Sequence, residues 1–387
     1  MKKNIKIIAL IVIVALFSAV LMSCTGNYTG KDDYNYYPAQ PDYAQESGDE
    51  FTEITENKFL KASEFPSSSF ALTVSTAAYP NLRRYINNGY KINKNQVRIE
   101  EIVNYFKYDY PAPNDGDPLS VQANFFDCPW NEEAKLLTVG LRAEDVEIGS
   151  IHNNLVFLLD VSGSMRGADR LGLMQSAFLL LLDNLGENDV VSIVTYAGGD
   201  SVLLSGANGA EKDRISNVID DLAAGGSTAG AAGIVTAYEL AEEYFIEGGN
   251  NRVILATDGD FNVGISSREG LESLITQKRE SGIYLTALGF GFGNLKSNNL
   301  ETLANKGNGS YAYIDTINEA RKVLVEEIGG TLYTIARDAK ARVEFNPEYV
   351  DSYRLLGYEN LLLTEEQWEE PEADAGEIGA GFTVTAV

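Results

Sequence analysis

Residues 155–165 have the sequence LVFLLDVSGSM, an apolar run followed at once by acidic and small residues. The apolar run has no polar position, which is typical of a strand buried on both faces of a parallel sheet. Asp160, Ser162 and Ser164 then alternate with small or apolar residues, and Gly163 permits a tight turn. Open parallel sheets bind ligands beyond the carboxyl ends of their strands. The stretch therefore predicts a central strand that leads into a polar binding loop.

The surrounding residues 151–332 alternate short apolar runs with helical patterns. This alternation predicts right-handed βαβ units, and hence an α/β domain with a doubly wound, mostly parallel six-stranded sheet. The expected strands are Leu155–Leu159, Val190–Val194, Ser201–Leu204 at an edge, Arg252–Ala256, Ile283–Leu288 and Ser310–Ile314. The expected helices are Leu171–Leu185, Glu211–Leu222, Ala231–Phe245, Arg268–Ser281, Asn299–Asn305 and Ile317–Leu332.

Two segments flank this domain, residues 59–150 and residues 333–387. We expect both to form one smaller β-rich subdomain, into which the α/β domain is inserted; two separate small subdomains are the alternative. The strands expected in the flanks are Phe70–Val74, Leu119–Phe126, Leu136–Arg142, Ala339–Phe345, Arg354–Leu356 and Phe382–Val387. The expected helices are Leu82–Ile86 and Val97–Phe106, the second with amphipathic spacing.

The first 24 residues have the parts of a secretory signal. Lysines near the start precede the apolar run Ile7–Val20, and the run ends in Leu21-Met22-Ser23-Cys24, which resembles a bacterial lipobox. The resemblance implies cleavage before Cys24 and lipidation of its thiol; an uncleaved membrane anchor is the alternative. Both interpretations place the protein outside the cytoplasm on a bacterial membrane, at the cell surface or the periplasmic face.

Residues 25–58 are polar and acidic and have no hydrophobic period. Such a segment buries too little apolar surface to fold by itself, so we expect a flexible linker that holds the folded part away from the bilayer.

The composition excludes several classes of function. Thirty basic and 56 acidic residues give a net charge of −26, which argues against nucleic-acid binding because phosphate backbones are repelled. The single histidine, His152, rules out multi-histidine zinc sites and leaves little room for Ser-His-Asp catalysis. We expect His152 to lie at the surface or at a strand edge. Cys24 and Cys128 are the two cysteines, and no disulfide framework is expected.

Three polar clusters fall at or beside the ends of expected strands. Asp160, Ser162 and Ser164 follow the first strand, Thr228 lies in a Gly-Gly-Ser-Thr loop before a helix, and Asp258 follows the fourth strand. Hydroxyl and carboxylate oxygens suit hard cations, so we expect Mg²⁺, or else Mn²⁺ or Ca²⁺. With only two carboxylates in the set, the ion is short of negative ligands and remains open to a carboxylate from a partner. In the alternative interpretation, the aspartates cap helices and the serines form turns.

This set resembles the metal-ion-dependent adhesion site (MIDAS) of the von Willebrand factor type A (VWA) domain, whose fold is Rossmann-like. The resemblance implies that Ser162 and Ser164 coordinate the ion directly, and that Asp160, Thr228 and Asp258 do so directly or through water. It also implies a protein partner that supplies an acidic residue.

Stretches of both flanks resemble the N-terminal region and the C-terminal domain of unknown function in a bacterial group of VWA lipoproteins. Members of that group usually continue past the point at which this sequence ends, Val387, so we expect a truncated chain. Ser75 stands where an aspartate is expected. The stretches that carry the resemblance are Tyr79–Tyr85, Arg98–Glu101, Tyr105–Pro111, Val343–Pro347 and Tyr353–Asn360.

Three hypotheses for the function follow. The leading one is a non-enzymatic, membrane-anchored protein that binds its partner through a metal ion. The second is an assembly or scaffold factor of the envelope, with a structural or regulatory metal. The third, a metal-dependent hydrolase, is disfavoured because the sequence lacks the ligand density of a two-metal site, a phosphate-binding loop and a histidine near these motifs.

Overall fold

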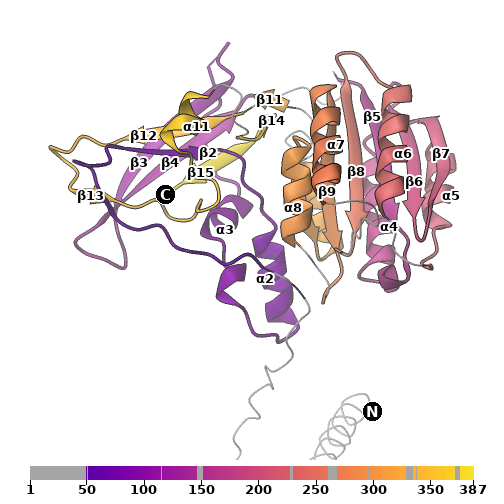
Figure 1. The fold of residues 1–387 in the computed structure, drawn as a ribbon, viewed down its shortest axis with the longest axis horizontal. Helices are drawn as coiled ribbons and strands as arrows, with labels where there is room; N and C mark the ends of the chain where they lie inside the picture. The colour runs from indigo at the N-terminus through magenta and orange to yellow at the C-terminus, as the bar shows by residue number, and fades with distance from the viewer. Residues whose placement is uncertain are drawn as a thin grey trace, which may run out of the picture. The chain divides into compact units, whose positions relative to one another are not determined.

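In the computed structural model the predicted central strand is β5 (Asn153–Asp160), and all of its residues are buried. It pairs in parallel with a neighbour on each side. The sheet has the order β10 (Tyr311–Ile314), β9 (Ile283–Phe290), β8 (Asn250–Thr257), β5, β6 (Val190–Tyr196) and β7 (Asp200–Asn208). Only the edge strand β7 runs antiparallel to its neighbour (Figure 1). The predicted six-stranded, mostly parallel sheet is confirmed.

The structure describes residues 49, 51–114, 116–145, 151–226, 230–259, 268–293, 297–327, 334–336, 338–370 and 375–387, all within the compact unit Tyr43–Val387. The secretory signal, Cys24 and most of the linker lie outside these residues, as does Thr228. Among the described helices, none has the length and apolarity that crossing a bilayer requires.

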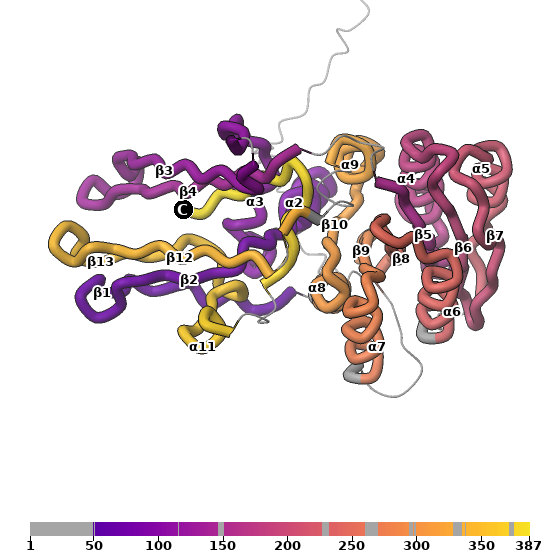
Figure 2. The backbone as a smooth tube through the Cα atoms, turned by 90° about the horizontal axis from the view of Figure 1, so that it is seen from above, coloured from indigo at the N-terminus to yellow at the C-terminus, as the bar shows by residue number. Residues whose placement is uncertain are grey.

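Helices cover both faces of the sheet, as a doubly wound fold requires (Figure 2). Alternate residues of β5 point to opposite faces. Leu155 and Phe157 belong to one apolar cluster, and Val156 and Leu158 to the other. The first face carries α4 (Leu171–Leu182), α5 (Lys212–Asp220) and α9 (Ile317–Arg321). The second carries α6 (Gly230–Glu243), α7 (Arg268–Glu280) and α8 (Ser297–Lys306).

The last helix of this domain differs from the prediction. The α-helical part, α9, ends at Arg321, and a wider π-helical turn, η3 (Lys322–Glu326), follows. The amide of Glu327 accordingly donates to the carbonyl of Lys322, five residues earlier. Leu324 in this turn is buried in the core. The apolar spacing therefore correctly predicts that Leu324 is buried, but it does not predict that the backbone forms a π-helical turn there.

The two flanks form one β-rich subdomain. The antiparallel pairs β2 (Ser67–Ala71) with β12 (Lys340–Glu344) and β4 (Lys135–Ala143) with β15 (Thr383–Ala386) each join a strand of the first flank to one of the second. Phe70, Leu141 and Val384 share its apolar core. The remaining elements are β1 (Leu60–Lys61) with β13 (Ser352–Tyr353), β11 (Thr334–Ala336) with β14 (Ile378–Gly379), β3 (Leu119–Asp127) beside β4, α2 (Ala78–Asn87), η1 (Lys94–Gln96), α3 (Ile99–Tyr105) and α11 (Glu365–Glu369).

One strand prediction in the flanks is wrong. The residues that pair with β1 are Ser352 and Tyr353, and residues 354–356 continue beyond the ladder. The amide of Leu356 donates instead to the carbonyl of Val387, at the end of the chain. A short apolar run therefore meets its backbone partner outside a regular strand.

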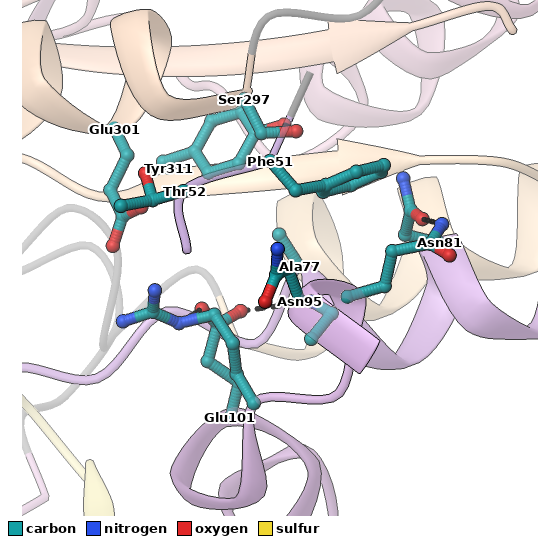
Figure 3. Close-up of a pocket in the computed structure, with 12 residues that line it drawn as sticks. Phe51, Thr52, Ala77, Asn81, Asn95, Glu101, Ser297, Glu301 and Tyr311 are labelled. Carbon is teal, nitrogen blue, oxygen red and sulfur yellow. Dashed lines mark hydrogen bonds and ion pairs between the residues drawn. The ribbon is translucent and has the colours of Figure 1, made fainter. Parts of the chain in front are cut away.

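Buried carboxyl groups lie where α3 meets α8. Arg98 Nε lies 2.7 Å from Glu101 Oε1, and the amide of Ala78 donates to Glu101 Oε2 at 2.8 Å. Glu301 of α8 lines the same cavity of about 40 Å³ (Figure 3). Desolvation, reinforced by the charge of Glu301, raises the pKa of Glu101 to about 8. Burial also raises the pKa of Glu301. Between about pH 5 and pH 8, the Glu101 carboxyl therefore keeps a proton in the folded chain that it releases in the unfolded chain.

We expect the free energy of unfolding to fall as the pH rises from about 5 to about 8, because the folded state binds more protons than the unfolded state over that window. Glu101→Gln keeps an acceptor for Ala78 and removes the titration, so it flattens this slope. Urea unfolding at several pH values measures the effect. Glu348→Gln, at an exposed position, is the matched control and retains the wild-type slope. An unchanged slope in Glu101→Gln contradicts the assignment.

Candidate metal-binding site

The site lies at the carboxyl ends of β5 and β8. Asp160 is the last residue of β5 and has no exposed surface, and Asp258, 2% exposed, directly follows β8. Since the two strands are paired up to Leu159 and Ala256, the two aspartates lie at the same edge of the sheet. The topology thus brings together residues that are far apart in the sequence.

A tight turn presents the two serines. Ser162 is extended, and the 3₁₀ turn η2 (Gly163–Met165) begins at the next residue. The amide of Gly163 donates to the carbonyl of Gly226 at 3.1 Å, and a Cβ on Gly163 would lie 3.3 Å from that oxygen. The described part of the Gly-Gly-Ser-Thr loop therefore packs directly on the serine turn, two residues before Thr228.

Three of the five predicted ligands form a hydrogen-bonded chain. The hydroxyls of Ser162 and Ser164 lie 2.9 Å apart, and Ser164 Oγ donates to Asp258 Oδ1 at 3.2 Å. Ser164 is only half-buried, so this cluster reaches the surface of the domain. Hydroxyl and carboxylate oxygens at this spacing are the donors that a small hard cation requires.

Asp160 lies deeper than these three residues, and its two carboxylate oxygens accept bonds from the serine turn and from the end of β8. The amide of Ser162 donates to Oδ1 at 2.8 Å, and the hydroxyl of Thr257 donates to Oδ2 at 2.9 Å. Burial raises the pKa of Asp160, and the hydrogen bonds from Ser162, Thr257 and the buried Tyr196 oppose that rise. Burial raises the pKa of Tyr196 well above its ordinary value, and the charge of Asp160 adds to that rise.

The carboxylate and hydroxyl oxygens of the site suit a hard divalent cation better than a soft metal. In the described part of the chain, no group of three carboxylate, thiol or imidazole side chains converges on one point. The site offers two carboxylates and neutral hydroxyls, a set that suits Mg²⁺, which commonly retains several of its waters. A nearby cation would also offset the unfavourable burial of the Asp160 charge.

Sequence patterns do not single out Arg170, which joins the loops around the site. Its Nη1 donates to the carbonyl of Ser164 at 2.9 Å, and its Nη2 donates to the carbonyl of Phe292 at 2.7 Å. Its Nε lies 3.8 Å from Asp258 Oδ2. Thr257 was likewise visible only as a neighbour of Asp258. Such side-chain contacts join segments that are far apart in the sequence, so a local sequence pattern does not predict them.

The other singled-out residues lie away from the site. His152 is exposed just before β5, at the opposite end of that strand from Asp160. Cys128 is a free, buried cysteine directly after β3. The roles of Thr228 and Cys24 stay predictions, because both residues lie outside the described part of the chain.

Family comparisons cover most of the chain. Residues 154–326 match the family described as von Willebrand factor type A domain. Residues 45–138 match one described as von Willebrand factor, and residues 330–387 match one described as "Uncharacterized protein YfbK, C-terminal".

Individual relatives match over different spans. Protein YfbK of Escherichia coli K12 is 42% identical over 343 residues, which cover 87% of this chain and 60% of that protein. Inter-alpha-trypsin inhibitor heavy chain H3 of Mesocricetus auratus is 28% identical over 195 residues, 48% of this chain and 22% of that protein. The chain therefore spans less than two thirds of either relative. A von Willebrand factor type A structure from Catenulispora acidiphila aligns with a TM-score of 0.42 at 17% identity, over 59% of this chain and 53% of that one.

We expect Thr257→Val to destabilise the fold by about 1–3 kcal/mol, because it keeps the side-chain shape but leaves a buried oxygen of Asp160 without its donor. Chemical unfolding at neutral pH measures the loss. Thr276→Val is the matched control, since that hydroxyl donates only to a carbonyl one turn back in α7. Equal losses in the two variants would show that the Thr257 bond has no special role in holding Asp160.

Proposed function

We propose that this chain, which carries a von Willebrand factor type A domain at residues 154–326, is a metal-dependent protein-binding module anchored to a bacterial membrane. The observation that carries the proposal is the contact of Ser164 Oγ with both Ser162 Oγ and Asp258 Oδ1. It gathers three oxygen donors from two loops at a half-buried edge of the sheet.

In this proposal Ser162, Ser164 and Asp258 bind the ion, and the buried Asp160 stabilises the serine turn by accepting from the amide of Ser162. Thr228 completes the set from the loop whose Gly226 carbonyl bonds to the turn. The ion, Mg²⁺ or else Mn²⁺ or Ca²⁺, supplies concentrated positive charge at the surface. The chain's own residues fix where that charge is held and leave it incompletely neutralised.

The positive charge that the site leaves on the bound ion indicates which kind of partner the site would bind. Two carboxylates balance a divalent ion only formally, and one of them, Asp160, already accepts bonds from Ser162 and Thr257. A carboxylate of a protein partner is the ligand that such a site favours. Because the chain has a net charge of −26, an acidic partner is repelled at long range, and the bound ion must provide the local attraction.

Metal binding is tested by titrating the full chain with Mg²⁺ and Mn²⁺ in a calorimeter. We expect one site in the wild type, loss of binding in Asp160→Ala and at least roughly tenfold weaker binding in Ser164→Ala. Asp213→Ala, which removes an exposed acid on α5, is the matched control and binds as the wild type does. Absence of binding by the wild type, or equal binding by folded Asp160→Ala, refutes the proposal.

Membrane attachment is tested by fractionating cells that express the full chain. We expect the Cys24→Ala protein to carry no lipid label and to leave the membrane fraction, because the substitution removes the thiol that the lipobox resemblance assigns to lipidation. Cys128→Ala replaces the other cysteine and leaves the protein in the membrane fraction. Retention of Cys24→Ala in the membrane, without lipid label in either protein, favours the uncleaved anchor instead.

A specific observation favours the second candidate, a scaffold or assembly factor with a regulatory metal. The flanking helix α2 contacts the loop that follows the serine turn, through Arg84 and Asp169. Crosslinking in cells separates the two candidates: a stable complex of envelope proteins favours assembly, and a ligand from outside the cell favours adhesion.

A further inference from the structure

We propose that Arg170 is a positioning residue for the metal site, and that helix α2 of the flanking subdomain sets through Arg84 how firmly Arg170 is held. The inference rests on the proposed metal binding at Ser162, Ser164 and Asp258. It adds a regulator to that site: the flanking subdomain, which supplies no metal ligand.

Arg170 connects three loops that the sequence keeps apart. Its guanidinium donates to the carbonyl of Ser164 after β5 and to the carbonyl of Phe292 after β9, and it lies beside the carboxylate of Asp258 after β8. A planar guanidinium presents its donors in a fixed geometry. Movement of the loop after β9 therefore acts on the serine turn through one rigid group.

The loop after β9 is shaped around this side chain. Gly291 has a φ of 75°, and a Cβ at this position would lie 2.4 Å from Nε of Arg170. A side chain larger than hydrogen would displace the guanidinium. Both the backbone conformation and the space at Gly291 thus suit the bonds that Arg170 makes.

Arg84 of α2 contacts the residue before Arg170 and, through a tyrosine hydroxyl, the loop after β9. Its Nη2 lies 2.6 Å from Asp169 Oδ2, one residue before Arg170. Its Nη1 donates to the hydroxyl of Tyr313 at 2.8 Å, and that hydroxyl donates to the carbonyl of Gly291 at 2.7 Å. The Arg84 side chain is 11% exposed and that of Asp169 is 51% exposed, so solvent screens this ion pair more than it affects the bond to the buried Tyr313.

Aromatic packing ties the same loop to the flank. The ring of Phe292 lies 5.1 Å from that of Tyr85 and 4.5 Å from that of Tyr90, between ring centroids. The guanidinium of Arg84 lies 5.3 Å from the Phe292 ring. Asp49 accepts from the amide of Gly293 at 3.1 Å and from the Tyr85 hydroxyl at 2.8 Å. The carbonyl of Phe292, an acceptor for Arg170, is therefore positioned by the flank.

The direction of the effect follows from preorganisation. A metal that coordinates Ser164 and Asp258 requires both loops in one arrangement, and the contacts of Arg84 and Arg170 favour that arrangement before the metal arrives. Loss of either contact increases the freedom that metal binding must remove, so metal affinity falls. Linkage makes the effect reciprocal: bound metal stabilises α2, and a partner that displaces α2 weakens metal binding.

The test compares Mg²⁺ affinities of full-chain variants by calorimetry. Arg84→Ala removes the contacts of α2, and Arg170→Lys keeps the charge beside Asp258 but loses the planar fork. We expect each to weaken Mg²⁺ binding roughly tenfold, within the usual range for groups that orient metal ligands. Arg342→Ala, which breaks an ion pair with Glu365 elsewhere in the flank, is the control and stays within about twofold of the wild type.

Hydrogen exchange of residues 78–90 provides a second readout. We expect Mg²⁺ to slow exchange there in the wild type and to have no such effect in Arg170→Lys. Asp169→Ala, at a half-exposed position, removes the acceptor of the Arg84 contact with little risk to folding and weakens Mg²⁺ binding in the same direction. Wild-type affinity in all three variants overturns the coupling and leaves the proposed metal site intact. No Mg²⁺ binding by the wild type overturns the metal site itself, and the coupling with it.

Discussion

A carboxylate with no exposed surface, at the end of the central strand, is the constraint on which the rest of this structure depends. A buried charge is tolerated only where donors surround it, and Asp160 obtains them from the amide of Ser162 and the hydroxyl of Thr257. Those two bonds fix the turn after β5 and bind it to the end of β8. The position of the serine hydroxyls at the edge of the sheet follows from this arrangement, and so does the place at which a cation would be held.

The sequence predicts much of the α/β domain because its strands are buried on both faces. Leu155–Leu159 is recognisable since every position must be apolar, and the polar residues at its end stand out by contrast. Ser162, Ser164 and Asp258 could be placed beyond strand ends for the same reason, and their role as metal ligands stays a prediction. Apolar spacing is less informative where the backbone departs from regular geometry, as in the π-helical turn after Arg321 and in residues 354–356, which lie outside a strand ladder.

Long-range side-chain contacts could not be predicted in this way. Thr257 at the end of β8, Tyr196 at the end of β6 and Arg170 before α4 act on groups in other elements, and the distances between these elements are set by the whole fold. The pairing of β2 with β12 and of β4 with β15 is also non-local, because the entire α/β domain lies between the partners. The amphipathic and alternating patterns of the flanks suggest strands and helices, but only the structure gives their register.

The buried position of Cys128 has a consequence for the redox chemistry of the protein. Exported proteins meet oxidising conditions, in which an accessible thiol forms disulfides with other chains. Lipidation of Cys24, as proposed, would leave Cys128 as the one free thiol among these 387 residues. At 6% exposure after β3, its sulfur is shielded from other thiols, and a buried thiol of this kind is chemically inert. Folding thus keeps this thiol from forming a disulfide with another chain.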